Sequence, residues 1–271
     1  MPKTSTAGSP QPSGEPVRRA TVVVHGRPDR IGDAVKRVER AATAAGVELT
    51  EDSPELAIVL GGDGTMLRAL QRFLPLHVPV IGVNFGRVGF LASMMPDDME
   101  EGLKRTFAGG HVIYELPTLE GDAGGATITA INDVVATSAG LGRMGEVEWH
   151  VGGEDMGRVP ADGVIASSPT GSTAYNLSNG GPVLMWGLDA LTVTFIAPHS
   201  LHARPVVVPR GRPVNFKNVS PDIPLAVIAD GRRFAELQPG DALNVRLGDQ
   251  RSLLATLPDA TFVTRYKGAF A

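Results

Sequence analysis

Three glycines, Gly61, Gly62 and Gly64, surround a single carboxylate, Asp63, directly after the apolar run 57–60. Glycine lets the backbone pass close to a bulky anion, and open α/β folds bind ligands at the carboxyl ends of their strands. Free N–H groups at a helix start suit phosphate, and a carboxylate near an acceptor hydroxyl can serve as general base or help to hold Mg²⁺. The alternative is a tight turn in which Asp63 only caps a helix, and the spacing alone leaves both open.

Residues 167–179 follow a predicted strand at 163–166 and carry short hydroxyl and amide side chains without charge. Such groups can bind a base or a ribose by hydrogen bonding, and the ring of Tyr175 can pack on one. The alternative is a surface loop with a helix N-cap. The polar members of this segment are Ser167, Ser168, Thr170, Ser172, Thr173, Tyr175, Asn176, Ser178 and Asn179.

Asn132 and Asp133 lie inside a predicted apolar strand at 131–135. One of the two must face inward or into a cleft, where a carboxylate is costly unless it is hydrogen-bonded. Because neighbouring strand residues point to opposite faces, a polar residue that simply faces solvent is the alternative.

Two other groups of polar residues, at 230–233 and at 199–202, are interpreted as structural rather than as ligand sites. The segment 230–232 predicts a turn, although Arg232 or Arg233 could reach a phosphate. His199 and His202 lack both a carboxylate partner and the H-E-x-x-H helix of a zinc site, so we predict no direct ligation of a metal by the protein.

The elements that position these residues differ between the two halves of the chain. In the first half, predicted strands alternate with predicted helices, which favours a Rossmann-like parallel sheet with crossover helices. From about residue 111 the runs are short, β-branched and separated by Gly, Pro and Asp, which predicts an all-β half. The first-half strands are 20–25, 57–60 and 78–83, and the helices are 31–45, 65–73 and 97–107.

The domain organisation follows from this change. Residues 1–18 are rich in Pro, Ser, Thr and Gly and predict a disordered tail. We expect an α/β domain over 19–110 and a β-rich domain over 111–271, with the chain end packing back on the first domain.

Composition excludes several classes of protein. The net charge is −4 and no basic block occurs, which disfavours a nucleic-acid partner. The absence of cysteine excludes disulfides, thiolate catalysis and Cys-ligated zinc. No apolar run approaches the roughly eighteen residues that a membrane span needs, so we expect a soluble, cytoplasmic protein without a membrane partner.

Four motifs together carry a family resemblance. They are GGDGT at 61–65, N-x-G-x-x-G-F-L at 84–91, the Asn-acidic pair at 132–133 and TGSTAYN-x-S-x-GGP at 170–182. In this order, over residues 20–265, they resemble the NAD kinases. Diacylglycerol, sphingosine and phosphofructokinases carry similar glycine turns, but the TGSTAY segment separates the NAD kinases from them.

The resemblance implies transfer of the γ-phosphate of ATP, or of polyphosphate in some members, to the 2′-hydroxyl of the adenosine ribose of NAD, which yields NADP. It also implies Mg²⁺ or another divalent cation, held mainly through the phosphates. The family has an N-terminal α/β domain and a β-sandwich-like C-terminal domain, and its members assemble as homodimers or homotetramers.

The family's functional residues map onto this chain by motif. Asp63 corresponds to the catalytic base. The expected neighbours of the phosphates are Gly62, Gly64, Thr65 and Asn84. The expected contacts to NAD are Asn132, Asp133, Asp162, Thr173, Ala174, Tyr175 and Ser178. At position 133 many members have Glu, so this chain has a carboxylate with a shorter reach.

Three alternative functions share part of this pattern. A lipid or sugar kinase of the same superfamily would keep GGDGT but would bring a different acceptor site in place of TGSTAY. A catalytically silent NAD(P)-binding regulator would not need Asp63. A dehydrogenase is disfavoured by the missing G-x-G-x-x-G fingerprint and by the β-rich second half.

Overall fold

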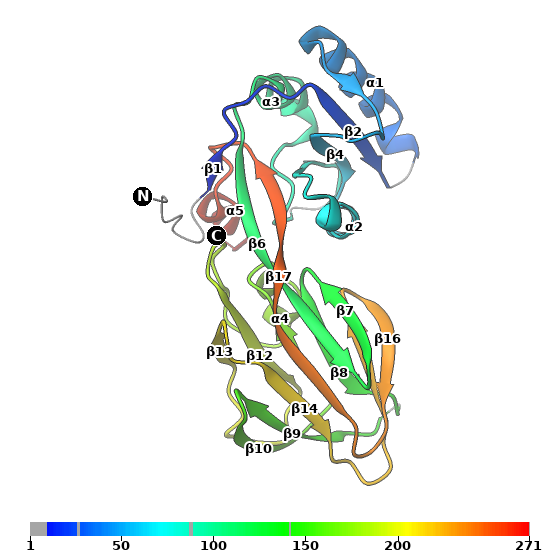
Figure 1. Cartoon of the computed structure of the whole chain (residues 1–271), viewed down its shortest axis with the longest axis vertical. Helices are drawn as coiled ribbons and strands as arrows, with labels where there is room; N and C mark the ends of the chain where they lie inside the picture. Colours follow the sequence, from blue (N-terminus) through cyan, green and yellow to red (C-terminus); the bar gives the residue numbers. More distant parts are fainter. Residues whose placement is uncertain (1–9, 26–27, 87–88, 141, 271) are drawn as a thin grey trace. The chain divides into compact units, whose positions relative to one another are not determined.

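The computed structural model describes residues 10–25, 28–86, 89–140 and 142–270, which form two compact units. The first unit ends at Leu116 and resumes at Ser252, and the second is Pro117–Arg251. The chain passes from one unit to the other within strands β6 (Val112–Ala123) and β17 (Ala242–Thr256) (Figure 1). The boundaries predicted from the sequence, 18/19 and 110/111, stay predictions.

The first unit is built on parallel strands in the order β3-β2-β4-β5, and the end of β17 continues this sheet by pairing with β5 in parallel. Every residue of β4 and β5 is buried, as expected for a parallel sheet covered on both faces. The bounds are β2 Arg19–Val24, β3 Glu48–Leu49, β4 Leu56–Gly61 and β5 Val80–Asn84.

Amphipathic helices complete the first unit. The apolar face of α1 is buried at Ile31, Ala34, Val38 and Ala42. The helices are α1 (Pro28–Ala45), α2 (Asp63–Phe73), α3 (Met99–Phe107) and α5 (Phe262–Phe270), with 3-10 turns at Leu74–Leu76 and Pro96–Asp98.

The second unit contains a six-stranded antiparallel sheet in the order β13-β12-β11-β8-β15-β16. Its bounds are β8 Asp133–Ser138, β11 Gly163–Ser167, β12 Ala190–Ile196, β13 Val206–Pro209, β15 Leu225–Ala229 and β16 Arg232–Leu237. Further antiparallel strands are β7 (Ala126–Ala130), β9 (Gly145–Val151), β10 (Glu154–Ala161) and β14 (Val214–Asn218). The predicted fold class, an α/β half and an all-β half, is therefore confirmed.

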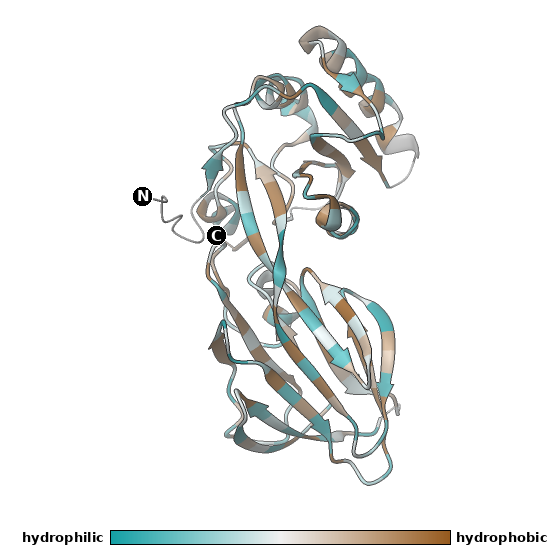
Figure 2. Ribbon diagram, in the orientation of Figure 1, coloured by the Kyte–Doolittle hydropathy of each residue, from teal (hydrophilic) through white to brown (hydrophobic). Residues whose placement is uncertain are grey.

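Side chains from both groups of strands form the core of the second unit. Along β9, buried and partly buried residues alternate, with Val147, Trp149 and Val151 facing inward. Figure 2 shows the corresponding alternation of hydrophobic and hydrophilic colours along the strands. This two-residue period is the one expected of strands with one face in a core.

Several elements differ from the sequence-based expectations. The predicted strand 131–135 begins only at Asp133, the first residue of β8. Residues 131 and 132 lie between β8 and β7, which ends at Ala130. The runs 242–247 and 252–256 form one long strand, β17. Strand β1 (Gln11–Pro12) pairs with β6, whereas residues 1–9 of the predicted tail lie outside the described residues. None of the helices in the described ranges is long and apolar enough to cross a membrane.

Candidate functional site

Asp63 is the first residue of α2, and Gly62 is the N-cap. The glycine turn is thus shorter than predicted, and Asp63 belongs to the helix rather than to the turn. Its carboxylate does not cap α2. Instead it accepts hydrogen bonds from the backbone N–H groups of Phe90 (2.7 Å to Oδ2) and Leu91 (3.0 Å to Oδ1). Two hydrogen bonds, one to each oxygen, hold this carboxylate in one orientation.

Gly89 makes this arrangement possible. A β-carbon built at position 89 would lie 2.3 Å from Oδ1 of Asp63, far inside contact distance. The last glycine of the N-x-G-x-x-G-F-L motif is therefore the residue that lets the 89–91 backbone approach the carboxylate. The motif residues Arg87 and Val88 lie outside the described residues.

Arg265, on α5, holds the same loop from another side. Its guanidinium donates to the carbonyl oxygens of Phe90 (2.7 Å) and Ala92 (2.5 Å), and Nε donates to that of Ala260 (3.1 Å). The side chain is buried, and this burial lowers the pKa of Arg265 to about 10 although Asp63 and Tyr114 oppose the shift. Arg265 is therefore still a cation at neutral pH.

The residues predicted to border phosphate lie at the carboxyl ends of β4 and β5. Gly61 of β4 pairs in register with Asn84 of β5. The amide oxygen of Asn84 accepts from the N–H of Gly86 (3.0 Å), and the hydroxyl of Thr65 donates to the carbonyl of His25 (3.4 Å). The remaining two predicted residues are Gly62 and Gly64, the second of which is exposed.

In the second unit, Asp230 organises the bend at Asn132. Its carboxylate accepts three backbone N–H groups, from Ile131 (2.7 Å), Asn132 (2.7 Å) and Asp133 (3.2 Å). The sequence suggested only a turn at Asp230, and its partners about a hundred residues earlier in the chain gave no local signal.

Asp133 is buried beside Asp230. Burial, together with repulsion from the Asp230 charge, raises the pKa of Asp133 to about 7. The expectation that one member of the Asn-acidic pair faces inward thus holds for Asp133. With a pKa near neutrality, its carboxyl group is protonated in a large fraction of molecules at pH 7.

The hydroxyl-rich segment packs directly on Asn132. Ser168 donates its N–H to the Asn132 carbonyl (2.8 Å) and its hydroxyl to the Ile131 carbonyl (2.6 Å). A β-carbon at Gly171 would lie 2.2 Å from the Asn132 carbonyl oxygen. Among the described residues, the amide oxygen of Asn132 and the hydroxyl of Thr170 are buried without a hydrogen-bond partner. Such orphaned groups suit a polar ligand.

Asn176 anchors the following turn. Its amide nitrogen donates to the carbonyls of Ser172 (3.1 Å) and Pro182 (3.0 Å), while its oxygen accepts from the hydroxyls of Thr192 (2.8 Å) and Thr194 (2.7 Å). The residue is fully buried. In the sequence, Asn176 is only one polar residue among several in this segment.

The predicted NAD contacts on this turn are more accessible. Tyr175 is 46% exposed and Ser178 is exposed, whereas Thr173 and Ala174 are partly buried. Asn176 thus fixes a turn whose neighbouring side chains stay available.

Asp162 lies apart from the other predicted NAD contacts in this unit. It precedes β11, which pairs with β8 so that Ser167 faces Asp133 while Gly163 faces Thr137. Asp162 comes five residues before Ser167, so it lies roughly 16 Å along the strand from the position paired with Asp133. It is exposed.

Comparison with known proteins identifies the family. The ATP-NAD kinase N-terminal domain matches residues 17–112, and the ATP-NAD kinase C-terminal domain matches residues 131–257. An NAD kinase of Gemmatimonas aurantiaca is 38% identical over 82% of this chain and 79% of its own. One from Heliobacterium modesticaldum is 36% identical over 93% of this chain and 85% of its own. The chain belongs to the ATP-NAD kinase family.

Membership of the ATP-NAD kinase family gives the chain its activity, the phosphorylation of NAD to NADP. An NAD kinase from Archaeoglobus fulgidus, solved in complex with ATP, superposes with a TM-score of 0.76 at 26% identity, covering 93% of this chain and 97% of its own. Yeast NADH kinase, complexed with NADH, has the same fold with a TM-score of 0.82 at 20% identity, covering 98% of this chain and 91% of its own.

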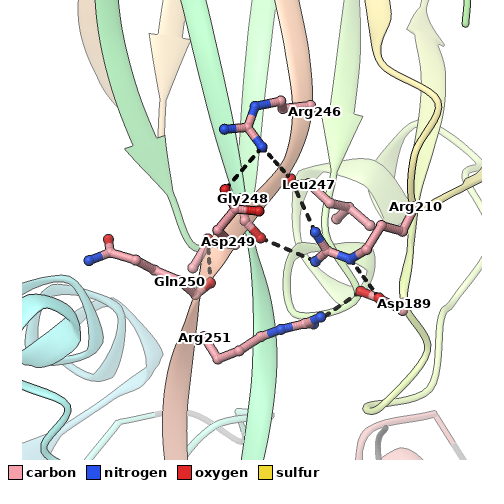
Figure 3. Close-up of polar contacts among 9 residues, drawn as sticks. Asp189, Arg210, Arg246, Leu247, Gly248, Asp249, Gln250 and Arg251 are labelled. Carbon is pink, nitrogen blue, oxygen red and sulfur yellow. Dashed lines mark hydrogen bonds and ion pairs between the residues drawn. The ribbon is translucent and has the colours of Figure 1, made fainter.

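One further polar cluster of this ATP-NAD kinase family member consists of a carboxylate held between two guanidinium groups (Figure 3). Asp189 accepts from Arg210 (2.6 Å) and from Arg251 (3.0 Å), and Arg210 also donates to the carbonyls of Leu247 (3.4 Å) and Gly248 (3.1 Å). Burial alone would raise the pKa of Asp189, but the two arginines outweigh it and lower that pKa. These contacts assign the cluster a structural role.

Within the ranges that the structure describes, no three His, Asp or Glu side chains lie close enough together to hold an ion. His199 and His202 are exposed residues of the segment after β12.

Proposed function

We propose that this ATP-NAD kinase family member transfers the γ-phosphate of MgATP to the 2′-hydroxyl of the adenosine ribose of NAD, with Asp63 as the general base. The ATP complex of the Archaeoglobus fulgidus NAD kinase supports ATP as donor. The carbon framework of NAD is unchanged, and only the 2′-oxygen gains a phosphoryl group.

The observation that carries this proposal is the fixed orientation of the Asp63 carboxylate. The N–H groups of Phe90 and Leu91 occupy one direction at each oxygen, and a carboxylate oxygen retains further lone-pair sites. One of these accepts the proton of the 2′-hydroxyl while that oxygen attacks the γ-phosphorus and ADP leaves.

Phosphoryl transfer requires mainly positioning and charge neutralisation. The N–H groups at the start of α2, next to Gly62, Gly64 and Thr65, suit phosphate oxygens, and Asn84 borders them at the end of β5. Mg²⁺ or another divalent cation enters as part of the nucleotide substrate, because Mg²⁺ usually binds through phosphates with few protein ligands.

NAD binding is assigned to the second unit. The orphaned amide oxygen of Asn132 and hydroxyl of Thr170 support hydrogen bonds to the nucleoside. A protonated Asp133 could donate one as well, and Tyr175 offers an exposed ring. The remaining assigned contacts are Asp162, Thr173, Ala174 and Ser178. Assembly as a homodimer or homotetramer is part of the same proposal, and light scattering would measure it.

The test is a coupled assay with MgATP and NAD, in which an NADP-specific dehydrogenase reports the product. Asp63→Asn should reduce kcat by at least about 100-fold while calorimetry finds NAD affinity within about twofold of the parent. Asp259→Asn removes an exposed carboxylate of the same unit and serves as the control. Near-normal turnover by Asp63→Asn would refute the base assignment. Product with polyphosphate but not with ATP would change the donor alone.

A further inference from the structure

We infer that Arg265 is a positioning residue for phosphoryl transfer, acting on Asp63 through the peptide unit that joins Phe90 to Leu91. The inference rests on the proposed role of Asp63 as base. Arg265 itself contacts backbone carbonyls of the loop, and its effect on the reaction is indirect.

The peptide unit between Phe90 and Leu91 has a charged side chain at each end. Its N–H donates to Oδ1 of Asp63 (3.0 Å), and its carbonyl oxygen accepts from Nη1 of Arg265 (2.7 Å). The peptide dipole therefore points its positive end at the carboxylate and its negative end at the guanidinium. A hydrogen bond at one end of an amide polarises the amide and strengthens the bond at the other end.

One peptide unit on each side of this central unit makes a further bond to Asp63 or to Arg265. The N–H of Phe90 makes the second bond to Asp63 (2.7 Å), and the carbonyl of Ala92 makes a second bond to Arg265 (2.5 Å). With two charge-assisted bonds at each charged group, rotation of the central peptide would break contacts to both. The orientation of the Asp63 carboxylate thus depends on where Arg265 holds this backbone.

Arg265 is placed firmly enough to act in this way. Nε donates to the Ala260 carbonyl (3.1 Å), and the residue is 8% exposed. The ring of Phe90 packs on Phe262 and Phe270 of the same helix, with centroids 5.7 and 5.6 Å away. A buried guanidinium is costly to desolvate unless its donors are satisfied, so the observed carbonyl contacts account for a cation at this position.

Two variants test the inference, with a matched control. Arg265→Met keeps the length of the apolar stem and removes the donors, whereas Arg265→Lys keeps the charge but cannot form the forked contact with two carbonyls. Arg105→Met is the control. Arg105 of α3 also holds the segment that precedes α5, through Asp259 (3.2 Å), but none of its side-chain hydrogen bonds that the structure describes goes to residues 89–92. Each variant is first checked for cooperative thermal unfolding.

We expect Arg265→Met to lower kcat by roughly 10- to 100-fold, the scale of a small misplacement of a catalytic group. The KM for NAD should stay within about twofold, and Arg265→Lys should recover part of the lost kcat. Arg105→Met should keep both constants near those of the parent.

Other outcomes separate the two proposals. A folded Arg265→Met enzyme with parental kcat would overturn the positioning role, even if Asp63→Asn were inactive. Equal loss of kcat in Arg265→Met and Arg105→Met would also overturn it, because it would show that Arg265 only attaches α5 and has no specific effect on Asp63. If Arg265→Met failed to fold, Arg265→Lys would decide the question. Parental kcat in Arg265→Lys would overturn the inference, and a loss of kcat in that variant at constant KM would support it. High turnover by Asp63→Asn would instead refute the base on which the inference rests.

Discussion

Asp63 and Arg265 hold opposite ends of one peptide unit, although 202 positions separate them in the chain and neither contacts the other through a direct hydrogen bond that the structure describes. The carboxylate accepts the N–H of Leu91, and the guanidinium donates to the carbonyl of Phe90. A short stretch of backbone thus connects the start of α2 to the C-terminal helix α5.

Gly89→Ala should impair catalysis more than stability. A β-carbon there would lie 2.3 Å from the Asp63 carboxylate, so either the loop or the carboxylate must move. Steady-state kinetics should show kcat lowered by roughly 10- to 100-fold with little change in the KM for NAD. Gly32→Ala, on the open face of α1, is the control and should leave kcat unchanged. Parental kcat in Gly89→Ala would contradict the proposed need for close approach.

Deprotonation of the Asp133 carboxyl group should lower the free energy of unfolding of the unliganded protein as pH rises. Its folded-state pKa is raised to about 7 from an ordinary value near 3.8, so between these values the native state binds more protons than the unfolded state. The free energy of unfolding should then fall with pH across this window, by up to about 1.4 kcal/mol per pH unit. Thermal unfolding of Asp133→Asn should lack this decline. Parallel pH curves for the parent and the variant would argue against the shift.

Asn176→Ala should be strongly destabilising. It removes four hydrogen bonds from a fully buried site and leaves the hydroxyls of Thr192 and Thr194 without this acceptor. We expect a loss of about 2–4 kcal/mol in denaturant unfolding. Asn179→Ala, which removes one exposed contact to the Tyr175 carbonyl, should cost less than about 1 kcal/mol. Similar losses in the two variants would contradict the anchoring role of Asn176.

Asp189→Asn should destabilise the second unit through its two arginine partners. The side chains of both ion pairs are 27–31% exposed, so we expect a cost of about 1–3 kcal/mol at neutral pH. Because the folded-state pKa of Asp189 is lowered, the contribution is present above the ordinary Asp pKa and is lost as pH falls through the folded-state value. Asp249→Asn, an exposed partner of Arg246, should cost at most about 0.5 kcal/mol. Chemical denaturation at pH 7 and at low pH would measure both.

Some properties of this protein follow from local sequence. The spacing of apolar residues predicts the helix at 31–45, and the β-branched runs between turn residues predict the strands of the second half, because both signals are local. The glycine and hydroxyl motifs carried the family resemblance, and their strand–turn–helix setting is also local. The prediction failed at 131–135, where Asp230 holds a bend in an apolar run.

The contacts that orient the site could only be decided by the tertiary structure. Asp63 is held by residues 27 and 28 positions away, Asn132 by Asp230 at a separation of 98, and Phe90 by Arg265 at a separation of 175. A carboxylate or guanidinium satisfies its hydrogen bonds with whichever backbone groups folding brings within reach. The periodicity and spacing of residues in the sequence do not predict those partners. The sequence therefore determined which residues carry the chemistry, and the packing of α5 and of residues 89–92 determined which way Asp63 points.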